Sequence, residues 1–344
     1  VGCSDTTCPE EEPTGPRGWF WQNPLPQGND LRGVFFTSTQ TGIAVGDAGM
    51  ILKTSDGGET WAIRESGIGD NLRGIWFTHP DTGIVVGHGS SILRTSDGGD
   101  SWSFHTEGHS DFFEDTGFFD SDTGLVVGYA GLILRTVDAG ATWARRHWGT
   151  QEWLYGVACS GDGIAVAVGR DETILLSTDS GSTWSRQASS GTADLYDVCL
   201  LDEGEGVAVG ESGTILHTTD GGITWSPRVS GTSEWLTSVH FVDGKVGTAS
   251  GRSGTILRTT DGGLTWTIQT SGTENWVYDV FSVNRNTILA VGMCGTILQT
   301  EDAGSSWQNK VTGTEYSLGD VALADAHVGV AVGWGGTVLK TVDG

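Results

Sequence analysis

The sequence predicts an all-β fold in which one short unit is repeated eight times. Three observations support this prediction: a period of 41 residues without insertions, four strand patterns in each unit, and glycine-rich turns between them. The period is clearest in one aspartate column, whose members are Asp56, Asp97, Asp138, Asp179, Asp220, Asp261, Asp302 and Asp343. Self-similarity at a fixed period of this length is typical of a propeller or a solenoid.

Each unit contains three short apolar runs and a fourth run that begins with tryptophan. In the first unit we expect strands at Leu31–Phe36, Gly42–Val45, Met50–Thr54 and Trp61–Arg64. Short runs bounded by Gly, Asp and Ser are typical of strands, and the 55 glycines would break helices throughout the chain. The sequence therefore predicts an eight-bladed β-propeller of four-stranded blades, with seven blades as the alternative count.

The turn before each tryptophan follows the pattern S/T-x-D-x-G-x-S/T-W, the Asp-box. In the first copy, the Thr54 hydroxyl and the Asp56 carboxylate can accept backbone N–H groups of a tight turn, and Gly58 can take a positive φ. One carboxylate per turn falls short of the roughly six to eight oxygens that calcium needs. We therefore expect a structural role for the aspartates of the seven complete boxes, Asp56, Asp97, Asp138, Asp179, Asp220, Asp261 and Asp302.

The eighth unit supplies an inner, a second and a third strand but no outer strand. Trp19 and Trp21 precede the first unit at nearly the spacing by which Trp61 precedes the second. We expect this N-terminal segment to complete the eighth blade, because an unpaired strand edge promotes association. Residues 19–344 then form one propeller domain, preceded by an acidic leader at 1–18 that contains Cys3 and Cys8. Added to a neighbouring chain instead, the same segment would produce a self-assembling filament or surface layer.

The combination V-G-x-x-G-x-I-L-x-T-x-D-G-G-x-T-W, seen at Val209–Trp225, recurs through residues 31–344. It resembles the YCF48/HCF136-type propellers of the Asp-box (BNR-type) superfamily. That resemblance implies a non-enzymatic extracytoplasmic or lumenal scaffold, known for helping photosystem II assembly. Those propellers have seven blades and an Arg-rich partner surface, whereas this sequence has eight units and a formal net charge of −25. Asp-boxes also occur in sialidases, xyloglucan-cleaving hydrolases and sortilin-like receptors, so the box indicates a fold rather than a chemistry.

In a propeller, the turn between the second and third strands and the link into the next blade open on one face, opposite the Asp-boxes. The V-G-x-x-G frame repeats at these turns but the two residues inside it vary, which is typical of a binding surface. We expect this upper rim to bind a partner, with aromatic side chains and arginines as anchors. The candidates are Asp47, His88, Tyr129, Arg170, Glu211, Arg252, Met293, Trp334, Trp153, Trp235 and Trp276. The alternative for the Trp and Tyr residues at the strand starts is that they fill the wedge between blades.

Patterns for catalysis or metal binding are weak. Glycoside hydrolysis needs two carboxylates about 5–10 Å apart. Asp171 and Glu211 are the best pair, but equal unit lengths leave no long loop to build a cleft. The eight histidines show no ligand spacing such as H-E-x-x-H. We therefore expect a non-catalytic protein-interaction or structural scaffold without cofactor or metal, and a glycan-binding or glycan-cleaving propeller is the alternative.

Composition restricts the partners. With 43 Asp and Glu against 18 Lys and Arg, the surface lacks the positive field that nucleic acids require, and no run approaches the roughly 20 apolar residues of a membrane helix. We expect a protein partner or self-association, with a glycan as the alternative, in an extracytoplasmic location.

The five cysteines are Cys3, Cys8, Cys159, Cys199 and Cys294. A disulfide within the leader, or from the leader to another chain, is one expectation for Cys3 and Cys8. Cys159 and Cys199 lie on innermost strands of consecutive units, where they could meet between the blades or point apart.

Overall fold

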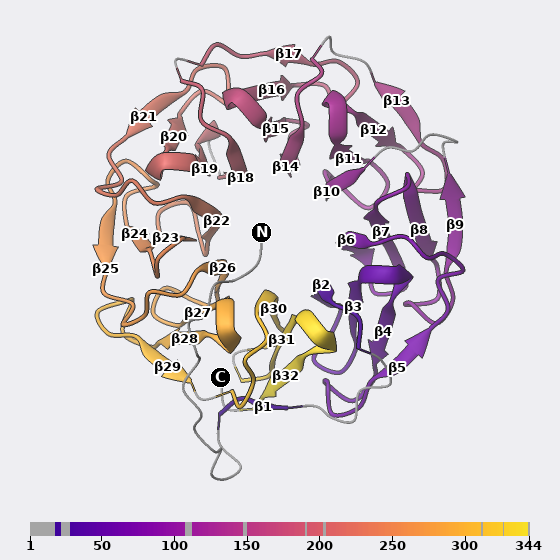
Figure 1. The fold of residues 1–344 in the computed structure, drawn as a ribbon. Coiled ribbons are helices and arrows are strands. Elements are labelled where there is room, and N and C mark those ends of the chain that lie inside the picture. The colour runs from indigo at the N-terminus through magenta and orange to yellow at the C-terminus, as the bar shows by residue number, and fades with distance from the viewer. Residues whose placement is uncertain are drawn as a thin grey trace.

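The computed structural model describes residues 18–21, 28–106, 112–146, 150–189, 191–201, 204–310, 312–325 and 327–342. Within these residues, 32 strands form eight four-stranded antiparallel sheets, arranged as blades around a central axis (Figure 1). The predicted all-β propeller of eight blades is confirmed, and the alternative count of seven is wrong. Residues 1–17 of the predicted leader, with Cys3 and Cys8, lie outside the described residues.

Each blade runs outwards from an innermost strand to a short strand on the circumference. The innermost strands are β2 (Leu31–Phe36), β6 (Leu72–His79), β10 (Phe113–Phe118), β14 (Leu154–Cys159), β18 (Leu195–Leu200), β22 (Leu236–Phe241), β26 (Val277–Ser282) and β30 (Leu318–Leu323). The second strands are β3 (Gly42–Gly46), β7 (Thr82–Gly87), β11 (Gly124–Gly128), β15 (Ala165–Gly169), β19 (Gly206–Gly210), β23 (Gly247–Gly251), β27 (Ile288–Gly292) and β31 (Gly329–Gly333). The third strands are β4 (Ile51–Thr54), β8 (Ser91–Thr95), β12 (Ile133–Thr136), β16 (Thr173–Ser177), β20 (Ile215–Thr218), β24 (Ile256–Thr259), β28 (Ile297–Thr300) and β32 (Val338–Thr341). The outer strands are β5 (Ala62–Arg64), β9 (Ser103–Thr106), β13 (Ala144–Arg146), β17 (Ser185–Arg186), β21 (Ser226–Arg228), β25 (Thr267–Gln269), β29 (Gln308–Lys310) and β1 (Phe20–Trp21).

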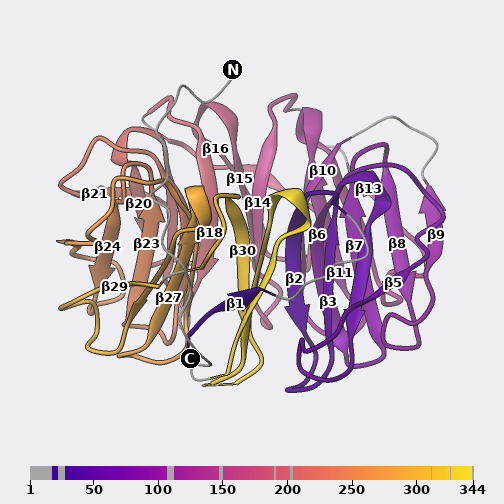
Figure 2. The same cartoon turned by 60° about the horizontal axis from the view of Figure 1, so that its bottom comes forward.

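Short 3₁₀ turns join the second strand to the third in six of the described blades. They are η1 (Asp47–Gly49), η2 (Tyr129–Gly131), η3 (Arg170–Glu172), η5 (Glu211–Gly213), η6 (Met293–Gly295) and η7 (Trp334–Gly336). These turns lie together on one face of the ring (Figure 2). No helix in the described residues is both long and apolar enough to span a bilayer.

The core is divided among the spaces between neighbouring blades. In the space between the third and fourth blades, Leu125 and Val127 of β11 pack with Leu154 of β14 and Leu175 of β16. The second strands are covered on both faces, so β11 and its equivalents are buried, apart from Thr82 at the start of β7. This explains why most of them are apolar at consecutive positions instead of alternating with polar residues; β23, with Thr248 and Ser250, is an exception.

The N-terminal segment completes the eighth blade, as predicted. β1 pairs antiparallel with β32, with Phe20 opposite Lys340 and Trp21 opposite Leu339. The Trp19 side chain is only 3% exposed and packs with Leu318 and Leu339 of the eighth blade. The third strand of that blade therefore has a partner from the same chain on its outer edge.

Aspartates on four of the innermost strands connect neighbouring blades through hydrogen bonds. Asp115, Asp197 and Asp320 each accept the backbone N–H of a residue in the next blade, from Val157 at 2.9 Å, Val239 at 2.8 Å and Val34 at 2.8 Å, respectively. Asp279 accepts the N–H of Val321 at 3.3 Å and the Ser238 hydroxyl at 3.0 Å. These bonds tie the ring together at its narrowest circumference.

Three of these aspartates, Asp197, Asp279 and Asp320, line a cavity of about 420 Å³ on the central axis together with His240. Burial raises the pKa of Asp115 to about 6 and that of Asp197 to about 7. The pKa of Asp320 is raised by burial and by the neighbouring Asp279 carboxyl. Asp115 and Asp197 therefore stay protonated at mildly acidic pH, where an exposed aspartate is ionised.

Cys159 and Cys199 are free thiols. Cys159 packs in the space between the third and fourth blades, and Cys199 in the space between the fifth and sixth. Of the two alternatives, the side chains therefore point apart. Burial raises the pKa of both thiols, that of Cys199 to about 12.

Candidate functional site: the VGxxG face

The V-G-x-x-G turn has a rigid backbone with a variable surface. A Cβ added to Gly210, the first glycine of the fifth turn, would lie 2.1 Å from the Asp194 carbonyl oxygen, so the close approach of two backbone segments requires glycine there. The second variable residue, Ser212, has φ +55°, and Gly213 has φ +69°. Close packing and the left-handed backbone thus restrict the residue types at three positions of the turn. Neither of them restricts which side chain the first variable residue can carry.

The fourth turn departs from this pattern. Glu172 replaces the second glycine, at φ +50°, and its side chain is buried with its carboxylate beside Gly191. Burial raises the pKa of Glu172, and a hydrogen bond from the Gly191 N–H opposes that shift.

The residue directly before each innermost strand is here called the link residue of its blade. In two turns, ring contacts place the first variable residue between the link residues of its own blade and the next. Tyr129 makes edge contacts with Phe112 of its own link and Trp153 of the next, with centroid distances of 6.1 and 5.3 Å. The Arg252 guanidinium lies between Trp235 and Trp276, 3.3 and 4.0 Å from their ring centroids. The structure therefore brings five predicted binding residues together in two clusters. Tyr129 and Trp153 form the first with Phe112, which was not predicted. Arg252 forms the second with Trp235 and Trp276.

The link residues fall into two classes that the sequence alone did not separate. Aromatic links lie on the rim. Polar links instead accept the N–H of the second variable residue of the preceding blade: Asp30 from Gly335 at 2.9 Å, Asn71 from Ala48 at 3.1 Å, and Asp194 from Asp171 at 3.0 Å. The polar links are therefore part of the turn architecture.

Aromatic contacts continue around much of the rim. From His88, ring contacts run through Phe112, Trp153, Tyr155 and Tyr196 to Trp235, with centroid distances from 4.7 to 6.4 Å. Beyond Arg252 they continue from Trp276 through Tyr278 to Trp334. Tyr129 is 46% exposed and Trp334 37% exposed, so these two rings present apolar surface to solvent.

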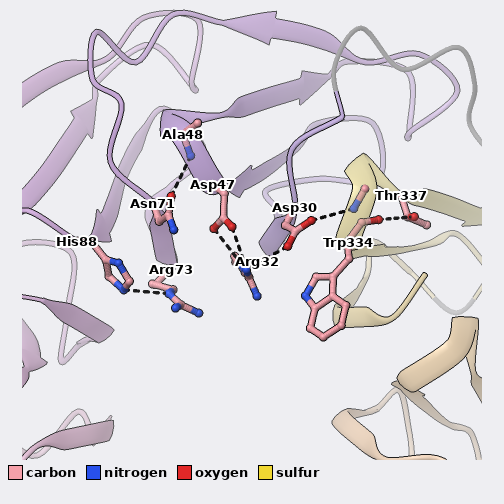
Figure 3. A network of polar contacts seen from close by, with 10 residues as sticks. Asp30, Arg32, Asp47, Ala48, Asn71, Arg73, His88, Trp334 and Thr337 are labelled. Atoms are coloured by element: carbon pink, nitrogen blue, oxygen red, sulfur yellow. Dashed lines mark hydrogen bonds and ion pairs between the residues drawn. The ribbon is translucent and has the colours of Figure 1, made fainter. Parts of the chain in front are cut away.

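The first two blades contribute a polar network instead (Figure 3). The Arg32 guanidinium donates to both oxygens of Asp47, at 3.1 and 2.9 Å, and to Asp30 at 3.2 Å. Arg73 donates to His88 Nε2 at 3.2 Å. Burial and the charge of Arg73 lower the pKa of His88, so His88 is neutral and accepts this bond. The positive charge of Arg32 is balanced by two carboxylates within the network.

Carboxylates lie beside the tyrosines of the fourth and fifth blades. The Tyr196 hydroxyl donates to Glu211 at 3.1 Å, and the Tyr155 hydroxyl lies 3.5 Å from Asp194. Burial raises the pKa of Tyr155, and burial together with Glu211 raises that of Tyr196. Glu114, on the adjacent inner strand, is half-buried, and burial raises its pKa. Asp171, the proposed catalytic partner of Glu211, is instead exposed.

The remaining predicted residues occupy the same face without a defined cluster. Arg170 is exposed, and Met293 is half-buried. Within the described residues, no group of three or more His, Cys, Asp or Glu side chains is placed to hold a metal ion.

The Asp-box turns lie at the opposite end of the third strands. In the first box, Asp56 accepts the N–H of Thr60 at 2.9 Å and the hydroxyls of Thr60 and Thr54 at 2.6 and 2.7 Å, while Thr54 accepts the N–H of Gly58 at 2.8 Å. The same bonds recur in the other six complete boxes, as in Asp97 and Asp220. Bonds from Ser101 lower the pKa of Asp97 to about 2. Turn groups thus occupy both carboxylate oxygens.

Comparison with known proteins identifies the family. The model described as "Photosynthesis system II assembly factor YCF48" matches residues 17–104, 66–147, 108–192, 188–269 and 229–312. The chain belongs to the YCF48 family. No protein of curated function matches the sequence.

Solved structures with the same fold include two YCF48 proteins. "YCF48 bound to D1 peptide" is 22% identical, with a TM-score of 0.64, covering 80% of this chain and 94% of that one. YCF48 from Cyanidioschyzon merolae is 18% identical, with a TM-score of 0.62, covering 94% and 98%. Chaetomium thermophilum Sqt1 bound to the N-terminus of the ribosomal protein L10 is 13% identical, with a TM-score of 0.74, covering 94% and 98%. At these identities, the likeness establishes the propeller fold that this YCF48-family chain shares with them.

Proposed function

We propose that this chain is a non-catalytic binding protein that holds a segment of another protein on its VGxxG face, outside the cytoplasm. The observation that carries the proposal is the rim of aromatic side chains and Arg252 on a rigid repeated frame. Trp, Tyr and Arg are the residues that most often dominate binding energy at protein interfaces. The frame holds them in place, so little conformational entropy is lost on binding.

Membership of the YCF48 family supports this proposal, because its model describes an assembly factor. Two of the structural neighbours are named for complexes with peptide segments, the D1 peptide and the N-terminus of ribosomal protein L10. The carboxylates on the face support a non-catalytic role, because Glu211 accepts a bond from Tyr196 and Asp194 caps a turn.

Site-specific photo-crosslinking in an extract of the native source tests the proposal. A photoreactive amino acid replaces Tyr129 or Trp334 on the VGxxG face and, as matched controls, Val137 or Ile223 in the Asp-box turns, which are 57% and 56% exposed. We expect one defined protein adduct from the first two positions and none from the controls. Adducts from the Asp-box positions alone, or only with a second copy of this chain, would overturn it. Adducts with glycan alone would favour the sugar-binding alternative.

A further inference from the structure

We infer that the VGxxG face recognises a basic peptide segment, whose lysine or arginine side chain inserts at an acidic-aromatic sector made by Glu114, Trp153, Tyr155, Asp194, Tyr196 and Glu211. The inference rests on the proposed function and specifies the chemistry of its partner. The sector belongs to the third, fourth and fifth blades, where the inner strands β10, β14 and β18 begin.

The aromatic surface of the sector is continuous. Tyr155 stacks on Trp153 with centroids 5.8 Å apart and an interplanar angle of 28°, and it contacts Tyr196 at 5.6 Å. Each ring is half-buried. Aromatic faces attract cations through their quadrupole, most strongly where water is partly excluded.

The slot between two tryptophans next to the sector already holds a cation of the chain itself. One blade further on, Trp235 and Trp276 hold the Arg252 guanidinium between them. Trp235 also contacts Tyr196 at 5.7 Å, so the slot and the sector share a continuous aromatic wall. The rim geometry is therefore already adapted to a planar cation.

The charges of the sector favour a cation as well. Glu211 and Asp194 lie at the hydroxyl ends of the two tyrosines, and Glu114 lies on the preceding inner strand, β10. By contrast, the Arg32 charge of the first blade is balanced by Asp30 and Asp47. The chain carries 25 net negative charges, which increases the rate of encounter with a basic segment.

Peptide titrations by fluorescence anisotropy test this inference. The probes are fluorescein-labelled nonapeptides of alternating Arg and Gly, Glu and Gly, or Gln and Gly, at physiological ionic strength. We expect saturable binding of the Arg-Gly peptide alone. The variant Asp194→Asn/Glu211→Gln removes two charges while keeping oxygen acceptors for Asp171 N–H and Tyr196, and it should weaken binding about tenfold.

The matched control is Asp122→Asn/Glu301→Gln, which removes the same charge from exposed positions on the Asp-box face. It should change the affinity less than about twofold. Tyr155→Leu should weaken binding about fivefold through loss of the cation–π contact. Arg170→Ala removes an exposed cation from the fourth turn and should strengthen binding about twofold, an effect that partial unfolding would not produce.

Equal losses in the sector variant and the control would show diffuse electrostatic attraction and overturn the inference. Preferential binding of the Glu-Gly peptide, or no binding of the Arg-Gly peptide, would also overturn it. In either case, partner adducts from Tyr129 or Trp334 in the crosslinking experiment would leave the proposed function standing, so the two failures are distinguishable.

Discussion

Removal of the Trp19 side chain tests whether the N-terminal segment closes the ring. A tryptophan side chain presents up to about 250 Å² of surface, and at about 25 cal/mol per Å² its burial contributes at most about 6 kcal/mol. Because an unfolded chain already buries part of that surface, the realistic figure is about 4 kcal/mol. Trp19 is 3% exposed, so Trp19→Ala should lower the free energy of unfolding by about that amount.

Urea unfolding followed by circular dichroism measures the loss. Trp19→Phe keeps most ring contacts and removes an Nε1–H that has no acceptor among the described residues, so it should cost no more than about 1.5 kcal/mol. Phe104→Ala, at a 46% exposed position on outer strand β9, should cost under about 1 kcal/mol. If Trp19→Ala were as stable as Phe104→Ala, the closure reasoning would be refuted.

Three further predictions follow from the frame, the Asp-boxes and the inner carboxyls. Gly210→Ala should lower the free energy of unfolding by more than about 3 kcal/mol, because the new Cβ would meet the Asp194 carbonyl. The control Gly244→Ala, with open space around it, should change that free energy by less than about 0.5 kcal/mol. Equal shifts of the melting temperature in the two variants would contradict this prediction. Asp220→Ala should cost about 1–3 kcal/mol by leaving turn donors unpaired, and calcium should shift the melting temperature of neither protein. Asp115 and Asp197 have folded-state pKa values of about 6 and about 7, above the ordinary 3.8, so the folded state binds more protons than the unfolded chain in that interval. Urea midpoints should therefore fall as the pH rises from about 4 to about 7 and then level off; a rise over that range would contradict the shifts.

The elements of the fold could be predicted from the sequence because the repeat encodes each of them locally. In the first unit, the structure begins and ends the strands within one residue of the expected bounds, for example Gly42–Gly46 against Gly42–Val45. Closure by Trp19 was predictable for the same reason, since the missing strand and its substitute share a spacing.

Contacts between blades could not be predicted, because they join residues about one repeat apart. No local pattern indicates that Asp197 accepts the N–H of Val239. Nor does any local pattern distinguish Asp194, which caps the turn at Asp171, from Trp235, which lies one repeat later and lines the rim. Tyr316 lies one residue before Ser317, which directly precedes the innermost strand of the eighth blade, and Tyr316 is exposed beside Gly335. The face was therefore predictable, but its division into capping and binding residues was not.

The most direct test of the account is the affinity of the crosslinked partner for two matched double variants. Tyr129→Ser/Trp334→Ser removes exposed aromatic surface from the VGxxG face, and Val137→Ser/Ile223→Ser removes exposed apolar surface from the Asp-box face. Isothermal titration calorimetry should show at least about a tenfold increase in Kd for the first variant and less than about twofold for the second. An unchanged Kd for the first variant, or a larger loss for the second, would contradict recognition through the VGxxG face.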